Sequence, residues 1–309
     1  MKRPIFVFGS PRSGVTLLEI ILGCHPDLGW LSQYNNLLPS RPIISTLSRL
    51  YEFPVLGSML YELAWKKRFL SKSVLPIPYE SWNFWERNLP GFKKGVQAML
   101  SHPPGAVDIT DDEVIKIRKL IDQCATFQGK PRFFATYGDY PRIQYLSQAF
   151  PDALFIHIAR DGRAVCESYF RMNQQGSFQS WDERHLWFRH MPQTWYKSFT
   201  EKHYNLFGFG VYRWKFYLDL CRQESSQISP ERFMQIHYED IVQNPILAIQ
   251  RIESFAGLRS STRVHHFVKQ TPPINCNTKW RKALTTEQLD QFFEIVTEKE
   301  NLSLLNDDM

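Results

Sequence analysis

The spacing of apolar and polar residues predicts short strands that alternate with helices along most of the chain. Four short apolar runs are bounded by glycine, proline or charged residues, and we interpret them as strands: residues 4–8, 132–136, 153–159 and 233–237. Runs of this length are typical of strands that a sheet buries on both faces. Strands separated by helices favour an α/β fold, a parallel, doubly wound sheet flanked by helices.

Helical patterns lie between these strands and after the last one. Thr110 and Glu113 form a capping box that opens an amphipathic helix to about Phe127. Further helices are predicted over residues 16–24, 141–150 and 164–172, in an aromatic-rich block over 181–221, from Asn244-Pro245 to Gly257, and after a cap formed by Thr285 and Gln288.

The segment between the first two predicted strands carries no strand pattern in its middle part. It predicts two helices and a loop rich in proline and tryptophan: residues 42–51, 58–72 and 75–90. An insertion of this kind in an α/β core is typical of a lid or a substrate-binding wall. We therefore interpret residues 1–309 as one domain that carries such an insertion over 37–130.

The turn after the first strand has the spacing of a phosphate-binding loop. The pattern Gly9-x-x-x-x-Gly14 is followed by Thr16, but Val15 stands where a Walker-type loop carries lysine. A loop of this shape points backbone N–H groups at one place before a helix N-terminus, which favours an anion. Arg12 is the only cation of the loop. The alternative is an ordinary strand–turn–helix connection.

A second loop, after the strand predicted over 153–159, also carries groups that bind anions. Arg160 ends the strand, and Ser168 lies about two turns into the following helix. A guanidinium fork and a hydroxyl that converge there suit a second phosphate, because open α/β sheets bind ligands beyond the carboxyl ends of their strands. In the alternative interpretation, Arg160 pairs with Asp161 or Glu167 and Ser168 lies on the helix surface.

Composition narrows the classes of function. The chain is 43% hydrophobic and 22% charged, which is an ordinary globular balance. No apolar run approaches the roughly eighteen residues of a membrane-spanning helix, and the early first strand leaves no room for a secretory signal. Five widely spaced cysteines without a Cys-x-x-Cys pair indicate reduced thiols in a cytoplasmic protein and no structural zinc. The net charge of +6 suits a polyanionic ligand but is too scattered for nucleic acid.

Taken together, the two loops resemble those of the sulfotransferases that use 3′-phosphoadenosine 5′-phosphosulfate (PAPS) as sulfuryl donor. Residues 9–18, Gly-Ser-Pro-Arg-Ser-Gly-Val-Thr-Leu-Leu, are similar to that family's 5′-phosphosulfate loop, and residues 155–168 are similar to its 3′-phosphate site. Two further stretches agree: residues 236–241 together with 244–245, and residues 278–282. The resemblance covers the α/β frame but not the insertion, and it is closest to the bacterial and tyrosylprotein branch.

The resemblance implies that the sulfuryl group is transferred without a metal ion and that adenosine 3′,5′-bisphosphate (PAP) is the product. It implies that five residues hold the 5′-phosphosulfate: Arg12, Ser13, Gly14, Val15 and Thr16. Arg12 would stabilise charge on the bridging oxygen as the sulfuryl group leaves. Arg160 and Ser168 would hold the 3′-phosphate. Other nucleotide contacts are expected from Arg171, Tyr238 and Lys279, and Trp280 is expected either against the adenine or in the core.

Two positions depart from the pattern of the family. Val15 replaces the usual threonine of the loop, and Gln33 stands where the tyrosylprotein branch carries its catalytic glutamate. An amide cannot take a proton from the acceptor, so another base is required. Glu80, an acid among aromatic residues of the insertion, is the first candidate and Asp139 is the second; the alternative for Glu80 is a solvated loop residue. Three histidines are set aside as bases: His25, His102 and His157.

We interpret the chain as a sulfotransferase that moves a sulfuryl group from PAPS to a hydroxyl or amine acceptor by in-line displacement. The expected partner is a small-molecule, glycan or lipid hydroxyl rather than a protein, and no nucleic acid. Two alternatives stay open. Gln33 favours a non-catalytic protein that binds PAP or PAPS on the same frame. An ATP-dependent small-molecule kinase is the other, and the missing lysine at position 15 argues against it.

Overall fold

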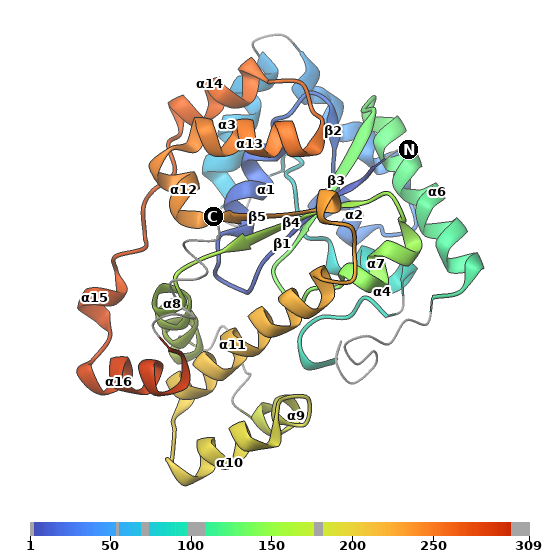
Figure 1. Ribbon diagram of the computed structural model, residues 1–309. Helices are drawn as coiled ribbons and strands as arrows, with labels where there is room; N and C mark the ends of the chain where they lie inside the picture. The colour runs from blue at the N-terminus through green and yellow to red at the C-terminus, as the bar shows by residue number, and fades with distance from the viewer. Residues whose placement is uncertain are drawn as a thin grey trace.

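A five-stranded parallel sheet forms the centre of the protein in the computed structural model, which describes residues 3–53, 56–68, 74–89, 91–97, 109–175 and 182–297 (Figure 1). The strands are β1 (Ile5–Phe8), β2 (Leu28–Gly29), β3 (Arg132–Tyr137), β4 (Leu154–Ala159) and β5 (Phe233–His237), in the order β2-β3-β1-β4-β5. All neighbouring pairs are parallel. The predicted α/β class with a doubly wound parallel sheet is therefore confirmed.

β1 lies at the centre of the sheet and fixes where a ligand can bind. It pairs with β3 on one side and with β4 on the other, so that Ile5 lies opposite Phe134 and Leu154. The chain crosses to one side of β1 for β3 and to the other side for β4, which makes the end of β1 a switch point of the topology. The loops that leave β1 and β4 therefore meet above the same edge.

Side chains of β1 alternate between the two faces of the sheet and define two cores. Ile5 and Val7 pack with α1 (Val15–Gly23), α13 (Pro245–Ala256), α14 (Thr262–Gln270) and α3 (Leu56–Arg68). Phe6 and Phe8 pack on the other face, which is covered by α4 (Trp82–Asn88), α6 (Asp111–Gln128), α7 (Ile143–Ala149), α8 (Gly162–Gln174) and α11 (Leu206–Ser225). Strands buried on both sides explain the continuous apolar runs in the sequence.

The other helical segments connect these layers or extend from them. They are α2 (Gln33–Leu37), η1 (Pro42–Glu52), α9 (Arg184–Phe188), α10 (Gln193–Glu201), η2 (Pro230–Arg232), α12 (Tyr238–Gln243), α15 (Trp280–Ala283) and α16 (Thr286–Ile295). α9, α10 and α11 make up the aromatic-rich block predicted over 181–221. The helices α15 and α16 lie beside α8 and α11, far from β2 (Figure 1).

Local signals predicted the ends of several helices correctly. The two predicted capping boxes, at Thr110 and at Thr285, are both formed. Gly257 closes α13 in a left-handed conformation, with φ 61°. Asn244 occupies the N-cap of α13 as expected, but its side chain makes no capping hydrogen bond.

The insertion differs from its prediction in two places. η1 is a 3₁₀ helix, in which every third residue is buried (Ser45, Ser48 and Tyr51), as its three-residue turn requires. α4 falls inside the predicted loop over 75–90, because Phe84 and Trp85 give one turn an apolar face that the core buries. The short strand β2 escaped prediction because two residues carry no periodicity. Part of the helix predicted over 58–72 lies outside the described residues, and the interpretation as one domain stays a prediction.

All five cysteines are within the described ranges, and none of them forms a disulfide; four are buried. None of the described helices is both long and apolar enough to cross a membrane.

Candidate functional site

A cleft of about 770 Å³ lies over the carboxyl ends of β1, β3 and β4. It brings together nearly all residues that the sequence singled out, although these come from six separate stretches of the chain. The predicted residues in its wall are Arg12, Gly14, Val15, Thr16, Glu80, Asp139, Arg160, Ser168, Arg171, Tyr238 and Lys279. The two predicted loops and the favoured acid therefore face one space.

The first loop forms a tight turn before α1. Ser13 donates both its backbone N–H and its hydroxyl to the carbonyl oxygen of Ser10, at 3.0 and 2.8 Å, so its side chain stabilises the turn. α1 then begins at Val15, and the backbone N–H groups of Val15 and Thr16 belong to a first turn that lacks partners within the helix. Both residues line the cleft, where the helix dipole favours an anion.

The loop requires glycine at position 14. Gly14 has φ 110°, and a Cβ atom there would lie 2.7 Å from Cδ2 of Tyr238. A side chain would thus be strained by the backbone and would also push Tyr238 away. Arg12 has a positive φ of 77° as well, without the freedom of glycine, which indicates local strain held by its contacts.

Two hydrogen bonds join the two loops. Nε of Arg12 donates to Oγ of Ser168 at 2.9 Å, and Nη1 of Arg160 donates to the backbone oxygen of Arg12 at 2.9 Å. Arg160 also donates to Asn277 and stacks on the ring of Tyr238, with 4.1 Å between its guanidinium carbon and the ring centroid. The Arg160–Glu167 and Arg160–Asp161 pairs of the alternative interpretation are not formed in the described structure.

Positive charge accumulates in this part of the cleft. Desolvation, followed by the positive charges of Arg171 and Arg160, lowers the pKa of Arg12, which remains protonated. Glu167 is the nearby carboxylate, and it forms an ion pair with Arg171 at 3.1 Å. The three guanidinium groups of Arg12, Arg160 and Arg171 thus outnumber the Glu167 carboxylate beside them, which favours an anionic ligand.

The segment after α14 covers this end of the cleft. The Tyr238 hydroxyl donates to the backbone oxygen of Ile274 and accepts from the backbone N–H of Cys276. Lys279, a few residues on, lines the cleft. Trp280 is buried and stacks on Arg163 at 4.2 Å, so it packs in the protein rather than in the wall of the cleft.

Glu80 is held in one orientation opposite the first loop. Its Oε1 accepts from the backbone N–H of Gly138 at 2.9 Å, and its Oε2 accepts from Nε1 of Trp82 at 2.7 Å. Desolvation, and after it the negative charge of Glu19, raise the pKa of Glu80 to about 7. A carboxylate with this pKa is a suitable general base near neutral pH. The solvated-loop alternative is not what the structure shows.

Gln33 has a structural role that the sequence did not reveal. Its side-chain amide donates to the backbone oxygen of Leu75 at 2.8 Å and accepts from the backbone N–H of Ile77 at 2.9 Å. Next to it, Ser32 pairs with Pro78 in an antiparallel bridge. The glutamine thus anchors the segment that leads into Glu80, and it does not line the described wall of the cleft.

Asp139 also lines the cleft, but its carboxylate is occupied. It accepts from the backbone N–H groups of Gly95 and Tyr140, at 2.6 and 2.9 Å, and lies 3.7 Å from Nη2 of Arg142. Two backbone N–H groups and the Arg142 guanidinium thus hold the Asp139 carboxylate within the fold.

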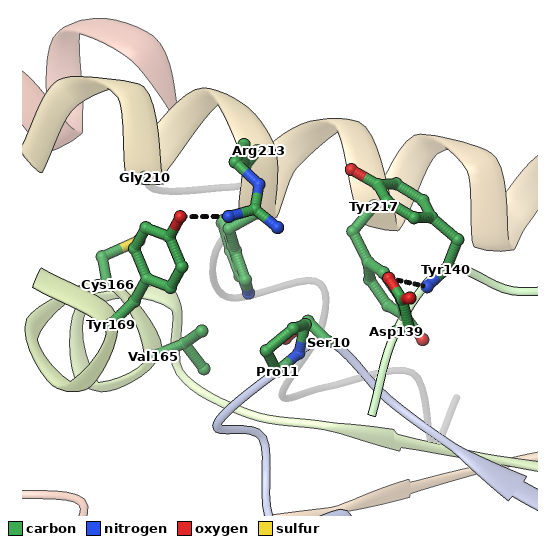
Figure 2. A pocket seen from close by; sticks show the side chains of 11 residues that line it. Ser10, Pro11, Asp139, Tyr140, Val165, Cys166, Tyr169, Gly210, Arg213 and Tyr217 are labelled. Atoms are coloured by element: carbon green, nitrogen blue, oxygen red, sulfur yellow. Dashed lines mark hydrogen bonds between the residues drawn. The ribbon is translucent and has the colours of Figure 1, made fainter. Parts of the chain in front are cut away.

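Arg213 is a site residue that sequence reasoning missed. It extends from α11 toward Tyr169 and lines both the cleft and a chamber of about 30 Å³ (Figure 2). Its guanidinium donates to the hydroxyl of Tyr169 and stacks on Trp187 at 4.1 Å. The sequence feature that could have identified it is a single arginine among the aromatic residues of α11, because guanidinium groups stack on aromatic rings.

The histidines set aside do not line the cleft where the structure describes them. His25 contacts the backbone oxygen of Arg259 at 3.0 Å, and burial lowers the pKa of His157, inside β4, to about 4. His102 lies outside the described residues. Within the described parts of the chain, no three His, Cys, Asp or Glu side chains gather as possible metal ligands.

The chain is similar to known proteins both in sequence and in fold. A sequence model of the sulfotransferase family matches residues 96–262, more than half of the chain and including Arg160 and Ser168. Sulfotransferase STF9 from Mycobacterium avium has a similar structure, with a TM-score of 0.59 and 17% identity over 95% of this chain and 75% of that one. STF1 from Mycobacterium tuberculosis gives a TM-score of 0.54 and 17% identity over 94% and 76%. No curated protein sequence matches.

The anchoring role of Gln33 predicts a loss of stability when its amide is removed. Gln33→Leu removes both hydrogen bonds to the 75–77 segment, and we expect it to lower the free energy of unfolding by about 1–3 kcal/mol. Gln33→Glu keeps the acceptor but cannot donate to Leu75, so it is expected to destabilise as well. Urea denaturation measures both. Gln223→Leu, at an exposed position of α11, is the control and should change little. Equal stability of all four proteins would contradict the anchor.

Proposed function

The chain belongs to the sulfotransferase family, and we propose that it transfers a sulfuryl group from PAPS to a hydroxyl or amine acceptor. The observation that carries the proposal is the pair of loops joined by the Arg12–Ser168 and Arg160–Arg12 hydrogen bonds, which face the same cleft as Glu80. Two phosphate-sized anion sites at a fixed separation suit a nucleotide with charged groups on both its 3′ and 5′ positions.

The first loop would hold the 5′-phosphosulfate. The backbone N–H groups of Val15 and Thr16 would donate to it, Gly14 allows it to approach, and Arg12 supplies positive charge. Ser13 would act through the turn that it stabilises. Arg160 and Ser168 would hold the 3′-phosphate, with further contacts to the nucleotide from Arg171, Tyr238 and Lys279.

The reaction would be an in-line displacement at sulfur. The acceptor oxygen or nitrogen forms a bond to sulfur while the bond from sulfur to the bridging phosphate oxygen breaks, and PAP leaves with the electron pair. Arg12 would stabilise the negative charge that grows on the bridging oxygen. A sulfuryl group carries less negative charge than a terminal phosphate, so these cations would be enough without a metal ion, and the lysine missing at position 15 is not needed.

Glu80 would take the proton from the acceptor. It lines the same cleft as Arg12, its two oxygens are oriented by Gly138 and Trp82, and its raised pKa suits a base. The acceptor would lie between Glu80 and the first loop, beside Trp187 and Arg213. A small-molecule, glycan or lipid hydroxyl suits this partly aromatic wall.

The rival interpretation as a non-catalytic binding protein rested on Gln33. Gln33 anchors the chain, and Glu80 supplies a carboxylate at the cleft. The amide at position 33 is therefore a weaker argument against catalysis. A kinase would need a substitute for the lysine of its phosphate loop, and Val15 offers none.

Replacing Arg12 tests the transfer itself. Arg12→Ala should lower kcat by about 10²–10³-fold, because it removes the charge beside the leaving oxygen. The variant should fold, since Arg12 is exposed to the cleft. Sulfate transfer from PAPS to a panel of phenols, alcohols and amines measures it, with Arg118→Ala on the exposed face of α6 as the control. Full activity of Arg12→Ala would contradict the assignment.

A pH profile tests the role of Glu80. The base acts when deprotonated, so kcat/KM of the wild type should rise with pH up to about 7 and then level off. Glu80→Gln should lose roughly 10²–10⁴-fold in kcat and lose that rise. Glu86→Gln, an exposed acid of α4, should keep both. A normal profile in Glu80→Gln would place the base elsewhere.

The same group predicts a change in stability with pH. The folded pKa of Glu80 lies above its unfolded value, so its contribution to stability is present below the unfolded pKa of about 4.5 and is lost as pH rises through about 7. Glu80→Gln should therefore gain in Tm relative to the wild type between pH 5 and pH 8. Thermal unfolding at the two pH values measures the difference, and an unchanged difference would contradict the burial of this charge.

A further inference from the structure

Arg213 holds a positive charge among aromatic side chains in the wall of the cleft. Its guanidinium carbon lies 4.1 Å from the ring centroid of Trp187 and 4.8 Å from that of Tyr169. The polar groups that it contacts are the hydroxyls of Tyr169 and Tyr140, which are uncharged phenols. Among the residues that the structure describes, no carboxylate forms an ion pair with Arg213. A charge that is largely enclosed by protein usually has such a partner, so its absence here calls for an explanation.

Three buried polar atoms at this place have no hydrogen-bond partner within the described parts of the chain. They are Nε of Arg213, Nε1 of Trp187 and the hydroxyl of Tyr217. Arg213 and Trp187 line the cleft, and Arg213 and Tyr217 line the small chamber beside it. Tyr217 follows Arg213 by one turn of α11, and its hydroxyl end lies on the side of Arg213 (Figure 2). The N–H groups of arginine and tryptophan can only donate, so this part of the wall has more donors than the protein provides acceptors for.

Asp139 is a carboxylate that acts on Arg213, but its charge is shared. Although desolvation by burial lowers the pKa of Arg213, two neighbouring tyrosines and Asp139 raise it by more, so the guanidinium stays charged. Asp139 itself accepts from two backbone N–H groups and lies 3.7 Å from Nη2 of Arg142. One carboxylate therefore faces two guanidinium groups, which leaves an excess of one positive charge. A neutral acceptor could satisfy the donors, but only an anionic oxygen would also balance this charge.

Charge and shape favour a carboxylate over a phosphate at Arg213. A carboxylate brings one negative charge, which equals the excess, whereas a phosphate monoester brings about −1.5 to −2 near neutral pH. A carboxylate is also planar, so it can accept from the guanidinium fork in the plane that lies against the Trp187 ring. The chamber beside Arg213 has a volume of only about 30 Å³, which leaves little room for a bulkier tetrahedral anion.

We propose that Arg213 binds a carboxylate of the acceptor, so that the acceptor carries both a hydroxyl or amine and a carboxylate. The inference rests on the proposed function, because it names the class of acceptor for that reaction. Arg213 and Glu80 line the same cleft, so the carboxylate end would bind to Arg213 while the hydroxyl lies at Glu80. Arg213 would thus determine which compounds bind, and it would take no part in the transfer of the sulfuryl group or of the proton.

Calorimetric titration of the full chain with two matched probes tests the carboxylate site. 4-Hydroxyphenylacetate carries a carboxylate, and 4-hydroxyphenylacetamide has nearly the same shape without the charge. Both are titrated in the presence of excess PAP, which competes for the two anion-binding loops. We expect the wild type to bind the acid about 10- to 100-fold more tightly than the amide. Arg213→Gln should bind both probes equally, and Arg213→Lys, which keeps the charge but not the fork, should retain part of the preference.

Arg222→Gln, at an exposed position of the same helix, is the control and should keep the full preference for the acid. If Arg213→Gln does not fold, as circular dichroism will show, the reduced preference of Arg213→Lys decides. The proposal would be overturned by a wild type without preference for the acid, including one that binds neither probe, or by a full preference in the Arg213 variants. A preference that Lys94→Gln alone abolishes would assign the carboxylate to Lys94, another cation of this cleft, and would overturn it too. Because the titration needs no transfer, a protein that binds the acid through Arg213 but sulfates nothing would contradict the proposed function and support the carboxylate site.

Discussion

The hydrogen bond from Arg12 to Ser168 is the interaction on which the site depends. It joins the loop after β1 to the helix after β4, and Arg160 strengthens the link by donating to the backbone of Arg12. The sheet order brings these loops together, because β1 and β4 are neighbours and parallel. Desolvation by burial, and after it the repulsion from the guanidinium groups of Arg171 and Arg160, lowers the pKa of Arg12. An anion that binds here would offset the positive charge of these guanidinium groups. An anionic ligand, as we propose for this site, would therefore stabilise the arrangement of the two loops.

The opposite wall of the cleft depends on a different kind of contact. Gln33 and Ser32 hold the 75–78 segment against the strand end near Leu31, and this brings Glu80 to the backbone N–H of Gly138. Gln33 stands at the position where a catalytic glutamate was expected, and it instead anchors the segment that leads into Glu80. Glu80 brings a carboxylate to the cleft from another part of the chain, and it is the group that we propose as the base.

Features that are set by residues close together in the sequence could be predicted, whereas contacts between distant segments could not. The two loops, the strands and the capping boxes are set by neighbouring residues, so their places were predicted correctly. Glu80 was identified from its aromatic surroundings, but its partners Gly138 and Glu19 lie far away in the chain and could not be foreseen. The same holds for Gln33 and for Arg213, whose roles arise only when distant backbone segments or aromatic rings pack against them. β2 was missed because pairing with β3, and not its own two residues, makes it a strand.

Calorimetric titration with PAP examines both proposed anion sites together, without any need for the acceptor. We expect PAP to bind in the presence of EDTA, and added Mg²⁺ not to strengthen binding. Adenosine 5′-phosphate, which lacks the 3′-phosphate, should bind about 10- to 100-fold more weakly, because hydrogen bonds to charged groups contribute about 1.5–3 kcal/mol. Arg160→Ala should abolish that difference between the two nucleotides. Equal affinity for both nucleotides in the wild type, or binding that requires Mg²⁺, would contradict the account.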